Sequence, residues 1–96
     1  MAGFRVTKAA KRDLVEIGSY TLERWGADQR KRYLMQLDSR FRWLAKNPKA
    51  GIASDEIRPG YLRYREGRHV IFYRISQLGV DIIRVLHERM LPTRHL

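Results

Sequence analysis

Two amphipathic segments stand next to each other in the sequence, with only Gly26 and Ala27 between them. Residues 8–25 and 28–46 each repeat apolar side chains at steps of three and four, which is the spacing of one face of an α-helix. So short a link requires the second helix to fold back on the first as a helical hairpin. The stripes comprise Ala10, Leu14, Ile17, Thr21 and Trp25 in the first segment, and Arg30, Leu34, Leu37, Phe41 and Leu44, widened by Tyr33 and Ala45, in the second.

Local signals mark the ends of both helices. Thr7 directly precedes the first segment and predicts an N-cap, because its hydroxyl can accept a free backbone N–H of the first turn. Gly26 follows the last residue of that segment, as expected of a C′ glycine, and Asn47-Pro48 ends the second helix. The stretch "FRVT" before the first helix alternates apolar and polar residues, which predicts a short strand with both apolar side chains on one face.

The shared apolar face of the hairpin needs a cover, and the second half of the chain supplies it. After an irregular connection come three stretches rich in β-branched and aromatic residues, "YLRYR", "RHVIFYRIS" and "VDIIRVLH". Glu66-Gly67 and Gln77-Leu78-Gly79 separate them and suit hairpin turns. The apolar run at residues 70–73 predicts that the middle stretch is central. The sequence thus predicts one α+β domain over residues 1–96, with element order β-α-α-β-β-β and a mainly antiparallel sheet.

Alternation along the outer strands predicts two unlike sheet faces. In "YLRYR" the side chains of Leu62 and Tyr64 point to one side, and those of Arg63 and Arg65 to the other. If the first pair faces the helices, the opposite face gathers arginines into a shallow basic groove. In the last strand, alternation places Ile83, Val85, His87 and Arg89 on one face and Ile82, Arg84 and Leu86 on the other.

The net charge limits the classes of partner that the chain is expected to bind. The formal net charge is +10, from 20 Lys and Arg against 10 Asp and Glu, and 15 of the 20 cations are arginines. Such a field attracts nucleic acid, an anionic surface or an acidic protein, and guanidinium groups favour forked bonds to specific anions. The chain has no cysteine and no apolar run of membrane-spanning length. We therefore expect a cytoplasmic protein that has no membrane partner and no thiolate metal site.

The stretch "RVLHERM" at residues 84–90 raises the question of catalysis. Metal-free RNA cleavage needs a base, an acid and a cation near the phosphate. Arg63, Arg84 and His87 supply these types, with Arg89 and His95 nearby in the sequence. The alternative is a structural role, in which His87 bonds to the backbone at the strand end and the arginines pair with acidic residues. The histidines lack a metal-binding spacing and no glycine-rich phosphate loop is present, so we expect no metal and no cofactor.

Other polar features have competing explanations. A free-standing nucleic-acid binder would use the same arginines with Tyr61, Tyr64 and Tyr73 as stacking platforms, whereas packing in the sheet explains these tyrosines equally well. Both tryptophans, Trp25 and Trp43, are expected in the core or at its rim. The loop "DEIRPG" is expected to be structural, with Arg58 paired to one of the two acids and a turn leading into the next strand. Its residues are Asp55, Glu56, Arg58, Pro59 and Gly60.

Longer patterns go beyond these generic signals. The order "DL..I..YT...WG..Q...Y...L...F..LA.NP..G" over residues 13–51 is followed by "DEIRPGY", "GRHVIFYRI" and "IIRVLHERM". In this order the chain resembles the ParE toxins of the RelE/ParE superfamily over nearly its whole length. It departs from them at Leu91, where these toxins commonly have an acidic residue.

The resemblance implies the fold described above and a biological role. It implies the toxin of a type II toxin-antitoxin system, with DNA gyrase as its target and a ParD-like antitoxin as its inhibitor. Operator DNA is then reached only through the antitoxin complex. RelE-like relatives instead cleave mRNA on the ribosome, and this enzymatic alternative stays open, although the ParE branch lacks the full nuclease cluster. We expect target or antitoxin contacts from Arg63, Arg65, Arg84, His87, Arg89, Met90 and Arg94, and no catalytic residue.

Overall fold

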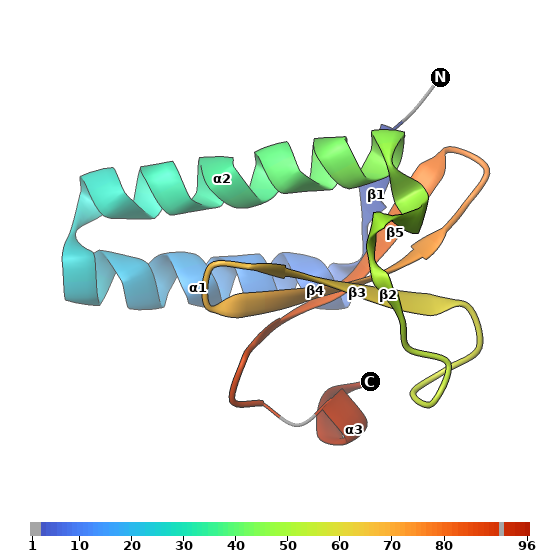
Figure 1. Ribbon diagram of the computed structural model, residues 1–96. Helices are drawn as coiled ribbons and strands as arrows, with labels where there is room; N and C mark the ends of the chain where they lie inside the picture. Colours follow the sequence, from blue (N-terminus) through green and yellow to red (C-terminus); the bar gives the residue numbers. More distant parts are fainter. Residues whose placement is uncertain (1–2, 91) are drawn as a thin grey trace.

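A hairpin of two helices packs on one sheet (Figure 1). The computed structural model describes residues 3–90 and 92–96, so Leu91 lies outside it. The helices are α1 (Lys8–Trp25), α2 (Ala27–Lys46), a short 3-10 turn η1 (Pro48–Ala50) and α3 (Pro92–His95). The strands are β1 (Gly3–Val6), β2 (Ile52–Ala53), β3 (Tyr61–Glu66), β4 (His69–Ile75) and β5 (Gly79–His87).

The sheet has the strand order β1-β5-β4-β3-β2. β1 runs parallel to β5, and every other pair is antiparallel. This confirms the predicted α+β fold and the central place of β4, and it assigns the "FRVT" strand to the β5 edge. β2 and α3 were not predicted, because two and four residues are too few to show a periodicity.

The core lies between the hairpin and the sheet. Thr7 caps α1 as predicted, since its Oγ1 accepts the N–H of Ala10 at 3.1 Å, and Gly26 leaves α1 with φ of 90°. Trp25 is an exception to the predicted stripe. Its side chain is 69% exposed because the hairpin extends past the sheet, which leaves the tip uncovered (Figure 1). The core cluster is Ala10, Ile17, Leu37, Phe41, Leu44, Ala45, Ile71, Tyr73, Val80, Ile82 and Val85.

A bulge in β5 overturns the simple alternation predicted for the last strand. Phe72 pairs with Arg84, whereas the next residue of β4, Tyr73, pairs with Ile82. Ile83 is therefore an extra residue, and a bulge of this kind shifts which face later side chains occupy. The prediction that placed Ile82 opposite Val85 is wrong, because both pack in the core beneath the helices. His87 and Arg84 still lie on opposite faces.

Steric crowding requires a glycine at position 79. Its φ is 153°, and a Cβ at this position would lie 2.1 Å from the carbonyl oxygen of Gly3. Only glycine allows β1 to approach the start of β5 so closely.

Within residues 3–90 and 92–96, no helix is both long and apolar enough to cross a membrane.

Candidate functional site

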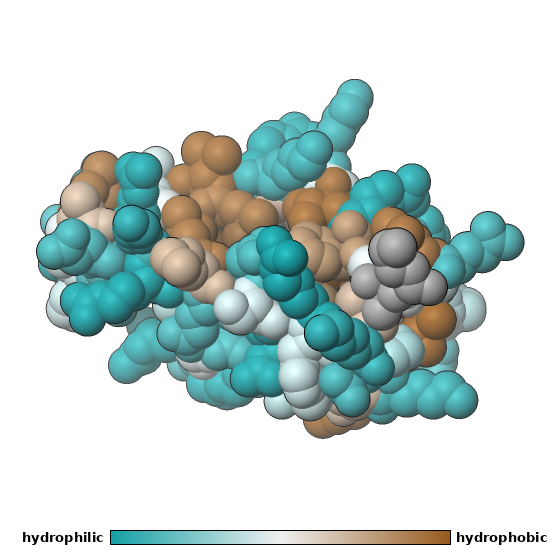
Figure 2. All heavy atoms as spheres, turned by 90° about the horizontal axis from the view of Figure 1, so that it is seen from above, coloured by the Kyte–Doolittle hydropathy of each residue, from teal (hydrophilic) through white to brown (hydrophobic). Residues whose placement is uncertain are grey.

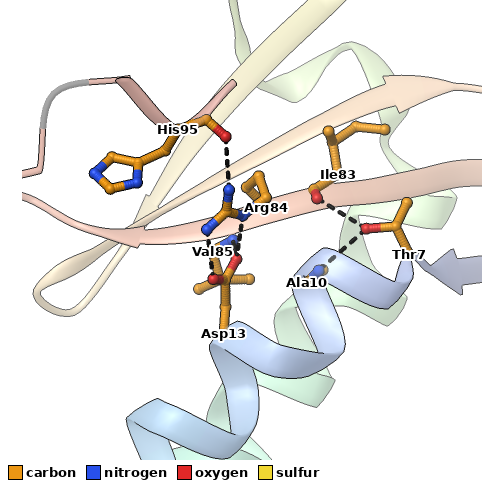
Figure 3. A network of polar contacts seen from close by, with 7 residues as sticks. All are labelled: Thr7, Ala10, Asp13, Ile83, Arg84, Val85 and His95. Carbon is orange, nitrogen blue, oxygen red and sulfur yellow. Dashed lines mark hydrogen bonds and ion pairs between the residues drawn. The ribbon is translucent and has the colours of Figure 1, made fainter. Parts of the chain in front are cut away.

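Arg84 lies at the centre of a polar network between α1 and the carboxyl-terminal segment (Figure 3). Its Nε donates to Asp13 Oδ2 at 2.7 Å and its Nη2 donates to Asp13 Oδ1 at 2.8 Å. The same carboxylate accepts the backbone N–H of Val85 at 2.9 Å. The remaining Nη1 donates to the carbonyl oxygen of His95 at 2.6 Å. All three guanidinium nitrogens are thus engaged within the protein.

The Asp13–Arg84 pair lies at the edge of β5, beyond the point where its pairing with β1 ends. β1 pairs with β5 only as far as Ile82, so the edge of β5 beyond that residue would expose its N–H groups. Asp13, which is 7% exposed, satisfies one of them and holds Arg84 in a forked pair. The hydrogen bond that Arg84 donates to Asp13 raises the pKa of Arg84, which stays charged. This arrangement favours a structural role for Arg84.

A second titratable cluster lies on the helix side of the sheet. His69 and His87 are cross-strand partners, with ring centroids 5.5 Å apart. His69 Nδ1 lies 2.6 Å from the hydroxyl of Tyr33, and this hydroxyl donates to the carbonyl of Glu66 at 3.2 Å. Burial, followed by the nearby His87, lowers the pKa of His69 to about 4. His69 is therefore neutral at neutral pH.

His87 sits at the end of β5. Its Nδ1 accepts the backbone N–H of Arg89 at 3.2 Å, which is the structural arrangement considered from the sequence. Because a neutral ring that accepts at Nδ1 carries its proton on Nε2, His87 in this form presents a donor to solvent.

The other predicted arginines occupy separate places. Arg63 pairs with Glu56 at 3.3 Å and Arg65 pairs with Glu88 at 2.6 Å. Arg89 and Arg94 are exposed, and neither forms an ion pair within residues 3–90 and 92–96. Met90 is 42% exposed.

The "DEIRPG" loop is held in a different way from the one predicted. Asp55 accepts the backbone N–H of Gly60 at 2.8 Å, and Glu56 reaches the strand arginine Arg63. Arg58 pairs with neither acid among the described residues, because both carboxylates point to these other donors. Pro59 precedes the glycine, whose φ of 86° turns the chain into β3.

The three residues considered for RNA cleavage do not come together. Arg63 and Arg84 share a sheet face, but Phe72 lies between them on β4, so their backbones are two strand spacings, about 10 Å, apart. His87 projects from the other face, on the same side as His69 and Tyr33. The sheet therefore lies between His87 and the two arginines.

A groove between the two helices is an apolar feature of the surface. It encloses about 440 Å³ beside β1, with Phe4, Val6, Leu14 and Leu34 among its walls. Gly18 lines it, and an added Cβ there would meet Leu34 in ordinary van der Waals contact at 3.4 Å. Figure 2 shows apolar side chains gathered over the helical layer and rimmed by polar ones. We call this feature the hairpin groove.

Sequence reasoning missed several of these residues. Asp13 carried a usable signal, because it lies within the apolar stripe of α1, where a carboxylate needs a buried partner. The partner itself, 71 residues away, had no local signal. Arg40 was also missed: it stacks over Trp43 and Tyr64 at 4.8 and 5.0 Å and pairs with Glu66 at 2.6 Å.

These features define a small, arginine-rich α+β protein in which a helical hairpin covers one face of a mixed sheet. The family described as "ParE toxin of type II toxin-antitoxin system, parDE" matches residues 4–92. The chain therefore belongs to the ParE toxin family, which confirms the resemblance noted in the sequence.

Individual relatives agree with this family. Over 94 residues the chain is 44% identical to Toxin ParE1 of Mycobacterium tuberculosis, covering 97% of this chain and 96% of the relative. It is 38% identical to Toxin ParE1 of Caulobacter vibrioides over 96 residues, covering 100% of this chain and 99% of the relative.

Two solved structures share the fold at low identity. A chain of the chromosomal ParDE toxin-antitoxin system from P. aeruginosa has a TM-score of 0.75 at 16% identity, covering 91% of this chain and 96% of that one. A chain of the RelBE2 toxin-antitoxin complex from Mycobacterium tuberculosis has a TM-score of 0.58 at 24% identity, with 90% and 96% covered.

Proposed function

We propose that this ParE toxin inhibits DNA gyrase by binding it, without chemistry of its own, and that a ParD-like antitoxin neutralises it. Membership of the ParE family supports the toxin role. The observation that supports inhibition without catalysis is the separation of His87 from Arg63 and Arg84 by the sheet. Proton transfer requires groups within about 3 Å of the reacting atoms, and this arrangement does not favour it.

The alternative is a ribosome-dependent ribonuclease of the RelE type. It retains one favourable observation, since His87 presents a ring edge near the exposed Arg89 at the end of β5. Arg84, in contrast, has all three nitrogens bonded within the protein. A nuclease that used it would first have to break a forked pair with a buried carboxylate.

A supercoiling assay with purified gyrase and toxin tests the proposal. We expect inhibition of supercoiling by the wild-type chain and equal inhibition by His87→Ala, which removes the candidate acid–base group. A parallel incubation with translating ribosomes should leave the mRNA intact. Undisturbed gyrase together with rapid mRNA cleavage that His87→Ala abolishes would replace this function with the ribonuclease alternative.

The hairpin groove is the surface that best suits the antitoxin. Val15 on its wall is 69% exposed and Met35 of α2 is 60% exposed, so apolar side chains are left uncovered on both helices. Antitoxins of this kind bring a disordered, typically acidic segment that folds on binding, and a chain of net charge +10 attracts it. A helix laid in this groove would bury the uncovered apolar surface.

A pair of matched variants tests this assignment. Val15→Asp places a charge on the groove wall, whereas Tyr20→Asp places the same charge at a 54% exposed position of α1 outside the groove. We expect Val15→Asp to weaken antitoxin binding at least tenfold, about 1.4 kcal/mol, and Tyr20→Asp to change it little. Calorimetric titration measures both. Equal affinities for the two variants would remove the groove from the antitoxin interface.

A further inference from the structure

The sheet face opposite the helices, which we call the far face, combines arginines with an apolar centre. Strand register assigns its residues, because cross-strand partners share a face. Phe72 lies opposite both Arg84 and Arg63, and Val70 lies opposite Leu86. Asp81 lies between two arginines from neighbouring strands and pairs with both. The arginines of the far face are Arg5, Arg63, Arg65, Arg74 and Arg84.

The apolar centre of the far face is buried, and the chain's own carboxyl-terminal segment lies on the same side of the sheet. Phe72 is 2% exposed and Leu86 is 1% exposed, although neither belongs to the core cluster beneath the helices. α3 lies on the far side of the sheet from the hairpin (Figure 1), and Figure 3 shows Arg84 between α1 and His95. Pro92 and Leu96, at the two ends of this segment, are half-buried.

The attachment of this segment is slight. Between α3 and the sheet, among the described residues, the one hydrogen bond runs from Arg84 Nη1 to the carbonyl of His95, at 2.6 Å. The other bond of the segment is internal, from the N–H of Leu96 to the carbonyl of Pro92. A helix of four residues has no stability of its own. Among the described residues, the segment is thus held to the sheet by one hydrogen bond from a charged donor.

The contacts of residues 92–96 also indicate what else the far face can bind. This segment offers a carbonyl oxygen to Arg84, and apolar, half-buried residues stand at its two ends. A carboxylate accepts from a guanidinium more strongly than a neutral carbonyl does. We propose that the far face is the surface that engages the target, through an acidic and partly apolar segment of the target that displaces residues 92–96. This inference rests on the proposed function.

The charges on the far face favour a polypeptide over a nucleic acid. Each of the five arginines already has a carboxylate partner, drawn from four acidic residues, Asp13, Glu56, Asp81 and Glu88. Five arginines against four carboxylates leave a local excess of one positive charge on this face. Individual donors remain free, because Arg5, Arg65 and Arg74 are 67%, 65% and 51% exposed at the side chain. Separate donors around an apolar centre suit spaced carboxylates and apolar side chains.

Displacement of the segment is directly measurable. The chain has no cysteine, so Thr93→Cys and Lys46→Cys allow two spin labels at exposed positions, one on α3 and one at the end of α2. We expect one narrow distance in the free chain. Addition of gyrase without DNA should replace it with a broad distribution. Single-stranded RNA at the same concentration should leave it unchanged.

Charge variants and a truncation complete the test. Arg74→Gln should weaken gyrase binding about fivefold, whereas Arg32→Gln, the same change on the exposed surface of α2, should not. A chain ending at Met90 lacks the competing segment and should bind gyrase several-fold more tightly. Melting temperatures verify that each variant is folded. If the truncated chain does not fold, the label distances and Arg74→Gln decide.

The possible failures are distinct. Inhibition of gyrase with an unchanged label distance, or equal effects of Arg74→Gln and Arg32→Gln, would overturn the far-face inference and leave the proposed function standing. Absence of gyrase binding would overturn both. Release of the segment by RNA and not by gyrase would assign the far face to nucleic acid and reject the polypeptide partner.

Discussion

Two buried carboxylates, Asp13 and Asp81, are held by arginines in different ways. Asp13 is 7% exposed and Asp81 is 4% exposed. Arg84, the partner of Asp13, is itself mostly buried, with 20% of its side chain exposed. The partners of Asp81 are Arg5 and Arg74, whose side chains are 67% and 51% exposed.

The two sites differ in how well water can solvate the charge that remains when one partner is removed. If Asp81 loses a partner, a second arginine remains and both guanidinium groups are already hydrated. If Asp13 or Arg84 is removed, the other is left as a charge that water reaches poorly. A buried ion pair contributes little as a whole, yet breaking it by removing one partner is strongly destabilising. The two sites should therefore respond unequally to the same substitution.

Asp13→Ala should show the largest effect. It leaves the Arg84 guanidinium and the N–H of Val85 without their acceptor, so we expect a loss of about 3–5 kcal/mol in the free energy of unfolding. Urea denaturation followed by circular dichroism measures it. The double variant Asp13→Leu, Arg84→Met removes both charges and should recover much of the loss. If Asp13→Ala cost less than 1 kcal/mol, the pair would not be buried in solution.

His69 provides a third case, a partly buried group that forms no ion pair with any described residue. Its pKa in the folded chain is lowered to about 4 from 6.5, so the folded state favours the neutral ring. This contribution is fully present above pH 6.5 and is lost as the pH falls through 6.5 toward about 4. We expect roughly 2 kcal/mol less stability at pH 4 than at pH 7.5 from this residue, because solvent around the partly exposed ring reduces the effect of the shift.

Denaturation at a series of pH values tests this expectation. His69→Gln should flatten the slope between pH 6.5 and 4, because the ring that must charge is gone. His95→Gln, at an exposed position of α3, is the matched control and should leave the slope unchanged. Equal slopes for the wild-type chain and His69→Gln would show that the ring is charged in the folded state.

The contrast between these sites also explains what could be predicted from the sequence. Periodicity is local, so the helical hairpin, the cap at Thr7 and the central strand β4 followed from residues a few positions apart. Asp13 and Arg84 meet across 71 positions, and their pairing depends on where β1 ends. The bulge at Ile83 likewise has no sign in the sequence, and one extra residue was enough to reverse the predicted face of Ile82.

Asp81→Asn should have an intermediate effect. The amide keeps the shape of the carboxylate and one acceptor oxygen, while both arginines remain hydrated. We expect a loss of about 1–2 kcal/mol, the cost of weakened hydrogen bonds to charged donors. Comparison with Asp13→Asn in the same urea titration is the relevant measurement. A cost for Asp81→Asn equal to that for Asp13→Asn would contradict the hydration argument.

Arg5→Ala should have the smallest effect, and it tests the redundancy at Asp81 most directly. The bond from Arg5 is 3.2 Å long and comes from an exposed side chain, while Arg74 keeps its own bond at 3.1 Å. Exposed pairs of this kind contribute about 0.2–1 kcal/mol, so we expect a loss within that range, and a smaller one in high salt. Arg5→Ala combined with Arg74→Ala should cost more than the sum of the single changes, since only the double variant leaves Asp81 without a cation. Strict additivity would mean that Asp81 is hydrated in the folded chain and that its burial has no energetic consequence.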